Sequence, residues 1–485
     1  MARIYSVSHV PPEVNAYGMA KYSRSSAPMR DSLLELSQQK AEQFLNTFYF
    51  AYGHASIADL AHVALAIEDI SLLAAMDVVD EALWDGQERS TRYQSFDKAA
   101  YYQPIGAPDL YHQLNQDLYA HYRAFSPIVG DAYKGRYPMP EGMSAGTYGR
   151  TMRARAFDVA RYFLPLSTLT SVGQVTNARV LEQQIARLMA SPFEELRDIA
   201  AQMKVCVTQE QPFDLVVERL RRAQVDIPEA ILQELQTGPV LPTLVKYTEP
   251  AQYASALRAA MQPIALELLA NIPSQATEMV EVFEVPDTTI ETVSHLLYQE
   301  SHLPFEQILQ VVQGLAAPVK REILEMALAL RGPHDGWPAA FRHAPLLFDV
   351  TIDVGAFRDL NRHRRLFKTT QDLNGSMGYD VPEPIINFDM TASYHQAMTS
   401  HYEKIQALPT DLQPYVFPLA HRRRVLLAMD WAEAAYLIEQ RSKSAGHFSY
   451  RRTAAAMYTK LLEMDPVLAQ HIRVTPYHDF DPLER

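Results

Sequence analysis

Residues 346–368 read LLFDVTIDVGAFRDLNRHRRLFK, an alternating apolar run that is followed at once by a strongly basic one. The alternation in the first half predicts a strand with one buried face. It is clearest at Val350, Ile352 and Val354. The basic half, residues 357–368, is the most distinctive run of the chain. If this run is a helix, its arginines lie on several faces of that helix.

In such a helix, the triplet Arg362, His363 and Arg364 would point in three directions about 100° apart. Like charges this close repel one another, so an anion or nearby acids should compensate them. An arginine-rich helix is more often a solvated basic face. The apolar strand that leads straight into the basic turn nevertheless favours a pocket for a phosphate or a flavin.

A weak repeat divides the chain into two copies. Residues 4–11 read IYSVSHVP, and residues 280–286 read VEVFEVP, about 275 positions later. Each run alternates like a strand and then leads into a helical stretch that ends in tyrosine, at Tyr22 and at Tyr298. The intervening residues 225–278 are rich in proline, which interrupts helices. We place the join near residue 270, which predicts domains at 1–270 and 271–485.

The first copy lacks the basic triplet, because the corresponding point reads Asp80-Glu81-Ala82. A little further on, residues 88–93 read ERSTRY, in which Glu88 and Arg92 lie one turn apart and could pair. A hydroxyl beside a forked guanidinium, here Ser90 and Arg92, suits a phosphate. A surface turn with an ordinary ion pair explains this string at least as well.

A third candidate element begins at Asn177, a good helix N-cap. The helix that follows has an apolar stripe for the core, made of Leu181, Ile185 and Leu188. Arg179 and Arg187 fall on a separate polar stripe. Guanidinium groups beside a helix N-terminus can hold a diphosphate or a nucleotide phosphate, and a solvated face is about equally compatible with the periodicity.

Composition sets the broad class. The chain has 485 residues, 48% of them hydrophobic, and a formal charge of −13, which argues against general binding to nucleic acid. A single cysteine, Cys206, excludes a disulfide framework and a cysteine-based zinc site, and we expect it to pack in a helical core. No stretch has the length of apolar residues needed to span a membrane, so the expected compartment is the cytoplasm.

These motifs resemble the signature of flavin-dependent thymidylate synthases, in which an R-H-R triplet and a spacer precede E-x-S-x-R-Y. The second copy supplies the triplet, the first supplies Glu88, Ser90, Arg92 and Tyr93, and neither copy has both. Further first-copy segments follow in the family's order. They are GHASIAD at 53–59, with His54 and Ser56, which is similar to G-H-x-S-P-F-E; ARYFLPL at 160–166, with Arg161, similar to A-R-x-x-L-P; and NARVL at 177–181, similar to N-A-R-x-L.

The resemblance implies an α+β fold with two such repeats, each a small β-sheet flanked by helices, that together form a pseudo-dimer. Family members assemble as homotetramers whose active sites lie between subunits and borrow motif parts from neighbours. A fused pair can therefore complete hybrid sites from the triplet of one copy and the Ser-x-Arg of the other. We expect a homodimer that mimics the tetramer with fewer working sites.

The chemistry implied is reductive methylation of deoxyuridine monophosphate (dUMP) at C5. The methylene would come from methylenetetrahydrofolate and the hydride from reduced FAD, with NAD(P)H as a further cosubstrate. The resemblance assigns the nucleotide phosphate to Arg92 and Arg161, a further substrate contact to Arg187, and positioning to Glu88 and Ser90; Arg92, Glu88 and Ser90 are the catalytic candidates. The FAD-binding candidates are His54, Ser56, Asn177, Arg179, Arg362, His363 and Arg364.

Two alternatives remain open. A flavoenzyme of the same build could act on another pyrimidine nucleotide, because the spacer at 371–375 departs from the family's. A noncatalytic nucleotide-binding protein is the other, because Asp80-Glu81-Ala82 replaces a triplet. No histidine spacing suits a metal, so we expect no metal site. A second basic run, HRRR at 421–424, is interpreted as a solvated or subunit-contacting face.

Overall fold

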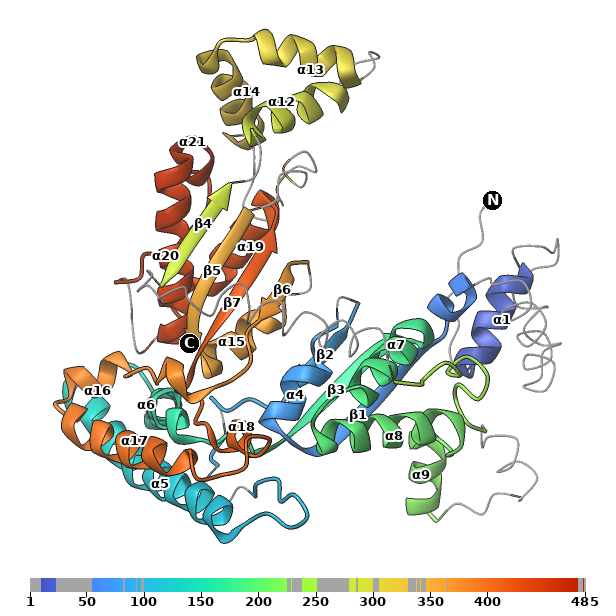
Figure 1. Cartoon of the computed structure of the whole chain (residues 1–485), viewed down its shortest axis with the longest axis vertical. Helices are drawn as coiled ribbons and strands as arrows, with labels where there is room; N and C mark the ends of the chain where they lie inside the picture. The colour runs from blue at the N-terminus through green and yellow to red at the C-terminus, as the bar shows by residue number, and fades with distance from the viewer. Residues whose placement is uncertain are drawn as a thin grey trace. The chain divides into compact units, whose positions relative to one another are not determined.

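The computed structural model describes residues 10–22, 55–81, 83–92, 94–96, 100–224, 228, 238–250, 279–284, 287–299, 305–329, 337, 341, 346–363, 365–478 and 483. Two compact units divide the chain (Figure 1). The first unit contains Met1–Ile70, Ala74–Arg89 and Thr170–Pro273, and the second contains Ser71–Leu73, Ser90–Leu169 and Ser274–Arg485. The second unit thus combines residues of both predicted copies, while the join near residue 270 stays a prediction.

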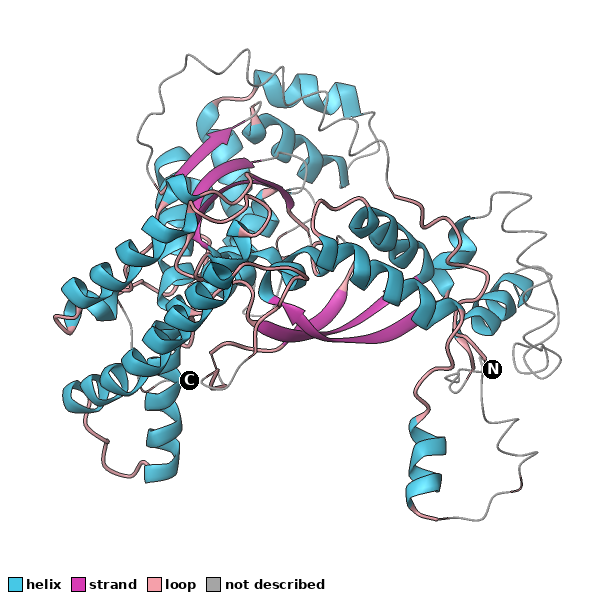
Figure 2. Cartoon of the chain, turned by 60° about the horizontal axis from the view of Figure 1, so that its bottom comes forward, coloured by secondary structure: helices cyan, strands magenta, loops and turns pink. Residues whose placement is uncertain are grey.

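The first unit is built on a three-stranded sheet in the order β1 (His62–Ser71), β3 (Leu169–Asn177) and β2 (Asp85–Glu88). Strands β2 and β3 run antiparallel, with Asp85 opposite Val175 and Glu88 opposite Val172. Helices pack on one face of this sheet (Figure 2). They include α7 (Ala178–Met189) and α8 (Glu194–Thr208), which contact each other.

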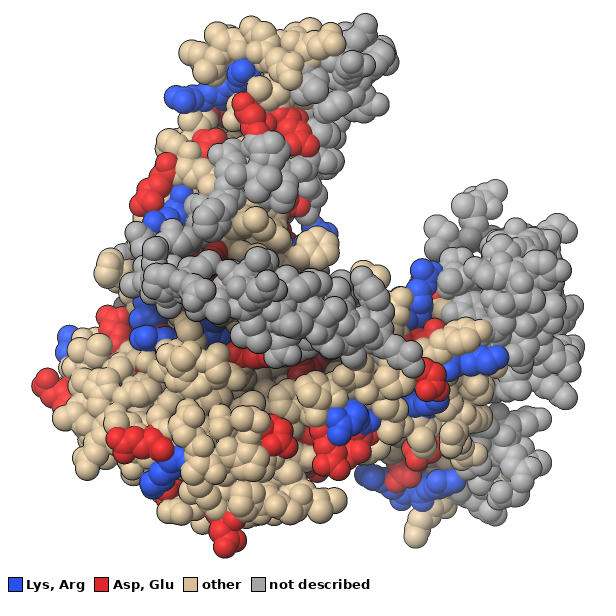
Figure 3. All heavy atoms as spheres, in the orientation of Figure 1, with Lys and Arg blue, Asp and Glu red and all other residues tan. Residues whose placement is uncertain are grey.

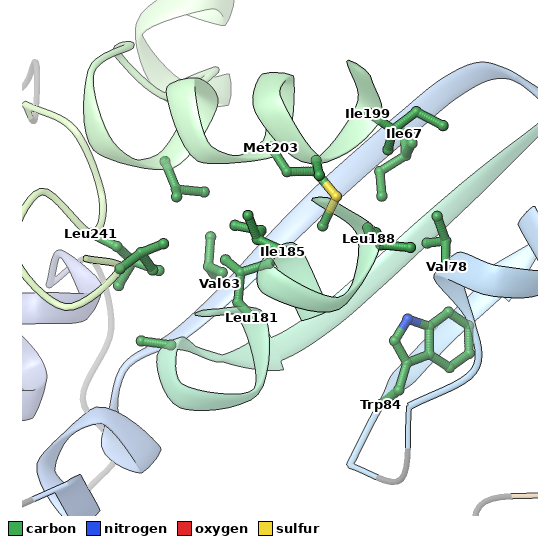
Figure 4. Packing of buried hydrophobic residues seen from close by; sticks show 14 of the residues in the cluster. Val63, Ile67, Val78, Trp84, Leu181, Ile185, Leu188, Ile199, Met203 and Leu241 are labelled. Atoms are coloured by element: carbon green, nitrogen blue, oxygen red, sulfur yellow. The ribbon is translucent and has the colours of Figure 1, made fainter. Parts of the chain in front are cut away.

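The core of the first unit lies between the sheet and these helices (Figure 4). Val63 and Ile67 of β1 point toward the apolar stripe of α7, which is buried as predicted from its spacing. The stripe consists of Leu181, Ile185 and Leu188. Met203 of α8 covers it from the other side. The neighbouring Cys206 is exposed, so the prediction that it packs in the core was wrong: the buried stripe of α8 passes through Met203 and Val207 instead.

The second unit contains a four-stranded antiparallel sheet in the order β4-β5-β7-β6. Its strands are β4 (Val280–Glu284), β5 (Leu346–Asp353), β6 (Phe367–Thr370) and β7 (Arg422–Met429). The strand predicted from the alternation in residues 346–354 is β5, and Leu346, Phe348 and Val350 are fully buried. Two small antiparallel sheets with flanking helices confirm the predicted α+β class.

The remaining elements are mostly helical. In the first unit they are α1 (Pro12–Tyr22), the 3-10 helix η2 (Ala55–Leu60), most of α4 (Leu72–Val78), and α9 (Leu215–Arg222). In the second unit they are α5 (Asp109–Arg136), α6 (Ala145–Ala160), η3 (Arg161–Phe163), α12 (Thr288–Gln299), α13 (Phe305–Gly314), α14 (Ala317–Ala329), α15 (Val354–Asn361), η5 (Gly375–Met377), α16 (Glu383–Asn387), α17 (Thr391–Ile405), α18 (Gln413–Val416), α19 (Trp431–Arg441), α20 (Phe448–Met464) and α21 (Pro466–Ala469). The predicted helices that end near Tyr22 and Tyr298 are α1 and α12.

The helix expected over residues 357–368 is shorter than predicted. Helix α15 starts at Val354, where Asp353 caps it by accepting from the backbone N–H of Ala356 at 2.8 Å, and it ends at Asn361. The backbone N–H of His363 donates to Leu360 O at 2.9 Å and closes the last turn. Strand β6 follows at Phe367, so Arg362 and His363, the two described members of the basic triplet, lie after the helix rather than along its face.

Equivalent backbone hydrogen bonds relate the two copies. Strand β1 passes into α4 where Leu72 N donates to Thr168 O at 2.9 Å and Leu73 N donates to Leu166 O at 3.0 Å. Strand β5 passes into α15 through the same pair of bonds. They run from Val354 N to His421 O at 2.8 Å and from Gly355 N to Leu419 O at 2.9 Å. The strand order β1-β3-β2 likewise matches β5-β7-β6. The repeat detected in the sequence therefore extends to the hydrogen-bonding pattern.

The two related Pro-Leu segments also pair with each other inside the second unit. Pro165 of the first copy forms an antiparallel bridge with Pro418 of the second. Two reciprocal bonds flank this bridge, from Leu166 N to Phe417 O and from Leu419 N to Leu164 O, each 2.9 Å long. Reciprocal contacts between equivalent positions are what a two-fold interface produces, so the two copies meet here as two subunits of a dimer would.

Candidate functional site

Arg92 occupies the middle of a buried polar network in the second unit. Arg92 is 7% exposed. Its side chain donates from Nε to Asp158 Oδ1 at 2.7 Å and from Nη2 to Asp158 Oδ2 at 3.3 Å. Nη1 donates to the hydroxyl of Tyr450 at 3.0 Å, and Nη2 also donates to Ala445 O at 3.2 Å. Burial disfavours the charged guanidinium and lowers the pKa of Arg92, but the attraction of Asp158 outweighs burial, so the pKa is raised overall.

Tyr450, in the first turn of α20, connects Arg92 to the second copy. The Arg92 guanidinium lies 5.7 Å from the centre of the Tyr450 ring, and the Arg441 guanidinium lies 5.4 Å from it. Both distances are in the range of a cation–π interaction. One aromatic ring thus links an arginine from each copy.

His363, the centre of the basic triplet, is held by this network. Arg441 Nε donates to His363 Nε2 at 2.9 Å, so that nitrogen carries no proton, and Nδ1 donates to Glu433 Oε1 at 3.3 Å. Burial lowers the pKa of His363, and the positive charge of Arg441 lowers it further. The hydrogen bond to Glu433 raises this pKa but does not outweigh them. The imidazole is therefore neutral, with its tautomer fixed by Glu433 and Arg441.

Asp359 supplies the negative charge that the triplet was expected to need. Arg362 Nη2 donates to Asp359 Oδ1, and Arg441 Nη2 donates to the backbone oxygen of Asp359 at 2.7 Å. Burial alone would raise the pKa of this carboxyl, but Arg362, Arg161, Arg441 and Arg92 lower it to about 2. A single carboxylate thus serves as counter-ion to arginines of both copies.

Arg161 differs from the other arginines because much of it is unpaired. It is 2% exposed, and within the described residues its side chain makes one hydrogen bond, from Nη1 to Thr91 Oγ1 at 3.3 Å. Nε and Nη2 are buried and have no hydrogen-bond partner among the residues that the structure describes. Burial lowers the pKa of Arg161 despite the attraction of Asp359 and Asp158. Orphaned donors on a buried guanidinium are costly, which marks a place where an anionic ligand fits.

Of the other members of the first-copy string, Ser90 contacts Arg92. Ser90 Oγ accepts from the backbone N–H of Arg92 at 3.2 Å, and the carboxylate partner of Arg92 is Asp158. Glu88 is the last residue of β2 in the first unit. The sequence had suggested Glu88 as the ion-pair partner of Arg92, and the structure assigns that role to Asp158 instead because Arg92 turns toward α6.

Asn177, Arg179 and Arg187 belong to the first unit. Asn177 caps α7, as predicted, by accepting from the backbone N–H of Val180 at 3.0 Å. Arg179 forms an ion pair with Asp59, and its Nε is buried without a partner. Arg179 and Arg187 therefore lie on the polar stripe as expected, and each is partly exposed and paired with an acid, Asp59 and Glu81 respectively.

Arg187 shows how the degenerate first copy compensates for its missing triplet. Its Nη2 donates to Asp77 O at 2.7 Å, just as Arg441 donates to Asp359 O. Its Nε donates to Glu81 Oε1 at 2.9 Å, where Arg441 instead meets His363. Glu81 thus stands in the position of His363 and forms an ion pair with Arg187, so this copy neutralises the arginine with an acid of its own.

The structure leaves some of the predicted site residues without a described environment. His54 and Arg364 lie outside the described residues, as does Tyr93, and Ser56 is placed only as part of η2. Their predicted contacts with FAD stay predictions.

Several network residues were not singled out by the sequence analysis. Asp158, Tyr450 and Asp359 have no motif of their own, and each is recognised by its contacts. Glu433 carried a signal, because Asp430 caps α19 and a carboxylate three residues after an N-cap is typical of a helix start. That position is, however, only 3% exposed, and Glu433 also binds His363.

The second basic run is only partly solvated, whereas a solvated or subunit-contacting face was expected; a subunit contact stays a prediction. It forms the start of β7, where alternate residues turn inward: His421 is fully buried and Arg423 is 8% exposed. Arg423 lies 4.4 Å from the centre of the Phe357 ring, while Arg422 pairs with Asp380 and Arg424 with Asp349. Strand alternation explains the difference, since two of four consecutive residues in a strand face inward.

The described surface carries mixed charge. On the face in Figure 3, lysines and arginines are interspersed with acids rather than gathered into a broad basic field. Within the described parts of the chain, no helix is both long and apolar enough to cross a bilayer.

Comparison with known proteins gives the family. The sequence model of the family described as thymidylate synthase complementing protein (Thy1) matches residues 7–213 and again residues 278–467. A UPF0159 protein of Chlamydia muridarum is 26% identical over 99% of this chain and 93% of its own length. A UPF0159 protein of Thermoplasma acidophilum is also 26% identical, over 96% of each chain.

Among solved structures, the UMP/dUMP methylase PolB from Streptomyces cacaoi, bound with 5-Br dUMP, aligns with 41% of this chain and 97% of its own. The sequence identity is 13% and the TM-score 0.33, values too low to support an argument about fold or ligand. The family assignment therefore depends on the two sequence matches, which together span more than half of the chain and coincide with the two copies. The chain belongs to the Thy1 family, the flavin-dependent thymidylate synthase family that its motifs resemble, and carries the family's sequence twice.

Proposed function

We propose that this protein is a flavin-dependent thymidylate synthase-like methyltransferase. Its reaction is reductive methylation of dUMP at C5, with methylenetetrahydrofolate as the carbon donor and NAD(P)H as reductant of the flavin. Family membership supports the reaction class. The observation that carries the proposal for this chain is the buried, half-unpaired guanidinium of Arg161 within a network that already contains the arginines of both copies.

In this proposal Arg161 is the main ligand of the nucleotide phosphate. Two of its nitrogens have no partner in the described part of the chain, and a phosphate oxygen would satisfy both in a low-dielectric environment where charge-assisted bonds are strong. Because these nitrogens are closed off from solvent, covering side chains must move when the nucleotide enters. Arg92 is engaged with Asp158 and Tyr450, so it orients the site and adds positive field rather than acting as the main phosphate ligand.

Positioning roles follow from the neighbours of Arg92. Ser90 already accepts from the backbone of Arg92 and retains its hydroxyl proton for a nucleotide oxygen. Neutral His363 and half-exposed Arg441 present an imidazole and a guanidinium in fixed orientation. Fixed dipoles of this kind can stabilise the negative charge that develops on the pyrimidine ring without reorganising. Glu88 and Arg187 keep their predicted substrate contacts as part of this proposal.

The donor set also fits FAD. Arg179 has a buried Nε without a partner beside the N-terminus of α7, and Arg362 is partly exposed, which suits the diphosphate of a dinucleotide. Asn177, His54, Ser56, His363 and Arg364 complete the proposed FAD-binding set. Bound and reduced, FAD supplies the hydride for the methylation.

The assembly proposed is a homodimer in which two fused chains replace the four subunits of the family's tetramer. The reciprocal Pro165–Pro418 pairing supports this idea, since it gives each chain one dimer-like interface internally. Light scattering coupled to gel filtration should then give twice the chain mass of 54.9 kDa. A monomer mass would contradict the assembly without bearing on the chemistry.

Two measurements test the activity. The visible absorption spectrum of the purified protein after incubation with FAD should contain a flavin band. Tritium should be released from C5-labelled dUMP when methylenetetrahydrofolate and NAD(P)H are added, and Arg161→Met should abolish this release. A flavin band without release from dUMP would favour another pyrimidine nucleotide as substrate, and absence of the band would point to a noncatalytic nucleotide-binding homologue.

A further inference from the structure

A pocket of about 220 Å³ lies in the second unit, lined by residues that the proposed reaction does not use. It opens between the end of α5, the short helix α16 and the start of α20, together with residues that follow α21. None of the residues predicted from the sequence as site residues lines it. Its lining includes charged, amide and aromatic groups in a small space, which is the composition of a ligand site rather than of a packing defect.

Aromatic rings form much of the wall. Tyr133 of α5 meets Phe388 edge-on, with ring centres 5.1 Å apart, and Phe448 of α20 and Tyr477 add further faces. Each of these four side chains comes from a different stretch of the chain, so the fold brings the rings together from four directions. A planar ring that enters the pocket can stack on such faces, and base–aromatic stacking contributes about 1–3 kcal/mol per base.

Polar groups are fixed at the base of the pocket. Arg451 is 1% exposed and donates from Nε to Ser442 O at 3.0 Å and from Nη2 to Pro476 O at 3.1 Å. Its guanidinium lies 5.7 Å from the centre of the Tyr477 ring, and the Tyr477 hydroxyl donates to Glu383 Oε2 at 2.5 Å. These contacts hold the ring of Tyr477 in place, so the wall exists before any ligand binds.

The rim carries the groups that would select a ligand. Asn387 is exposed and offers an amide, which can donate to and accept from the edge of a heterocyclic base. Arg136, exposed at the last turn of α5, offers a positive charge for an anionic substituent. Aromatic faces, an amide and a guanidinium are together the recognition chemistry of a nucleoside monophosphate.

We propose that this pocket is a second, separate site that binds one nucleoside monophosphate, with the base between the aromatic rings and the phosphate at Arg136. A volume of about 220 Å³ is below the roughly 300–1,000 Å³ typical of pockets for larger ligands. This size favours one base with its sugar over a flavin dinucleotide. The site does not depend on the proposed methylation, because no residue of the pocket belongs to the arginine network.

The pocket can be tested in a protein whose proposed substrate site is disabled. Saturation-transfer NMR on the Arg161→Met protein with AMP, GMP, UMP and CMP should show transfer to the base protons of at least one of them. Asn387→Trp, which fills the mouth of the pocket, should raise the dissociation constant of that nucleotide at least about tenfold, as expected for loss of base stacking. Gln396→Trp, at an exposed position of α17, is the matched control and should bind like its parent.

Two further measurements distinguish nucleotide binding at this pocket from a simple anion site and from a failure of the proposed methylation. Ribose 5-phosphate should bind far more weakly than the nucleotide, and equal binding would mean a simple anion site and would overturn the proposal. Asn387→Trp in the otherwise unchanged protein should retain tritium release from dUMP, so a failure of the methylation and a failure of the pocket are told apart. The proposal is also overturned when none of the four nucleotides binds the Arg161→Met protein, or when binding survives Asn387→Trp.

Discussion

Asp359 shows at the level of one residue why four arginines can share a small volume. Arg92 and Arg161 come from the first copy, Arg362 and Arg441 from the second, and all four act on this carboxylate, whose pKa falls to about 2. An ionised acid in their midst offsets much of the mutual repulsion. The remaining positive charge is what an anionic nucleotide would meet.

Arg161 allows a prediction that separates a functional role from a structural one. Because two of its nitrogens lack partners, Arg161→Met removes a buried charge that the protein satisfies poorly, and the free energy of unfolding should rise or stay within about 1 kcal/mol of wild type. Binding of dUMP, measured by calorimetry, should be lost. Greater stability with lost binding is typical of a residue kept for function.

Arg155 provides the matched control for that substitution. It is also 2% exposed, but it lies 3.9 Å from Asp158 in a buried ion pair. Arg155→Met should therefore destabilise the protein by about 1–3 kcal/mol, because a buried ionic contact is lost while Asp158 keeps Arg92 as its partner. Chemical denaturation measures both variants, and a large loss of stability in Arg161→Met would show that its guanidinium is structural.

At the level of elements, helix α7 depends on its cap. Asn177 satisfies the N–H of Val180, and replacement by alanine should cost about 1 kcal/mol of unfolding free energy. Gln183→Ala, an exposed change within the same helix, should cost much less, because alanine favours helix and no contact is lost. Urea denaturation of the two variants compares them. Equal stabilities would contradict the assigned cap.

His421, at the start of β7, should make the free energy of unfolding depend on pH. Burial, aided by Arg423, lowers the pKa of His421 from 6.5 to about 3, so the folded protein keeps it neutral while the unfolded chain takes up a proton below pH 6.5. The free energy of unfolding should therefore fall as pH drops from 6.5 toward 3, by up to about 1.4 kcal/mol per pH unit from this residue. His421→Gln should flatten the curve measured between pH 6 and 4.5, and parallel curves would refute the assignment.

The elements also show what the sequence could predict. Strand β5 and the two faces of α7 were predictable because burial follows periodicity, and Asn177 because a cap is a local interaction. The length of α15 was not, since its end depends on the turn into β6. The exposure of Cys206 and the burial of Arg423 depended on which face of an element meets the core, and a short run of residues does not contain that information.

The site was predictable only as a set of residue types. Arg92 and the triplet were recognised from motifs, but the groups that bring them together are remote in sequence. Asp158 is 66 positions from Arg92 and Tyr450 is 358 positions away. Such long-range pairs leave no local pattern, so the partners of each arginine had to come from the structure.

At the level of the whole molecule, the two copies keep different parts of the motif set. The second copy keeps His363 and Arg441, whereas the first has Glu81 in the equivalent position, paired with Arg187. The first copy keeps Ser90 and Arg92. Within the second unit, the chain therefore assembles one network from parts that two identical subunits would otherwise share.

The central claim, that arginines of both copies form one working site, is tested by a double-mutant cycle on kcat/KM for tritium release from C5-labelled dUMP. Arg92→Lys and Arg441→Lys keep the charge but lose the planar fork that contacts Tyr450. Each should lower kcat/KM, and the two effects should couple by about 0.5–3 kcal/mol because they share one ring. Effects that add to within about 0.3–0.5 kcal/mol, or a wild-type protein that releases no tritium, would contradict the account.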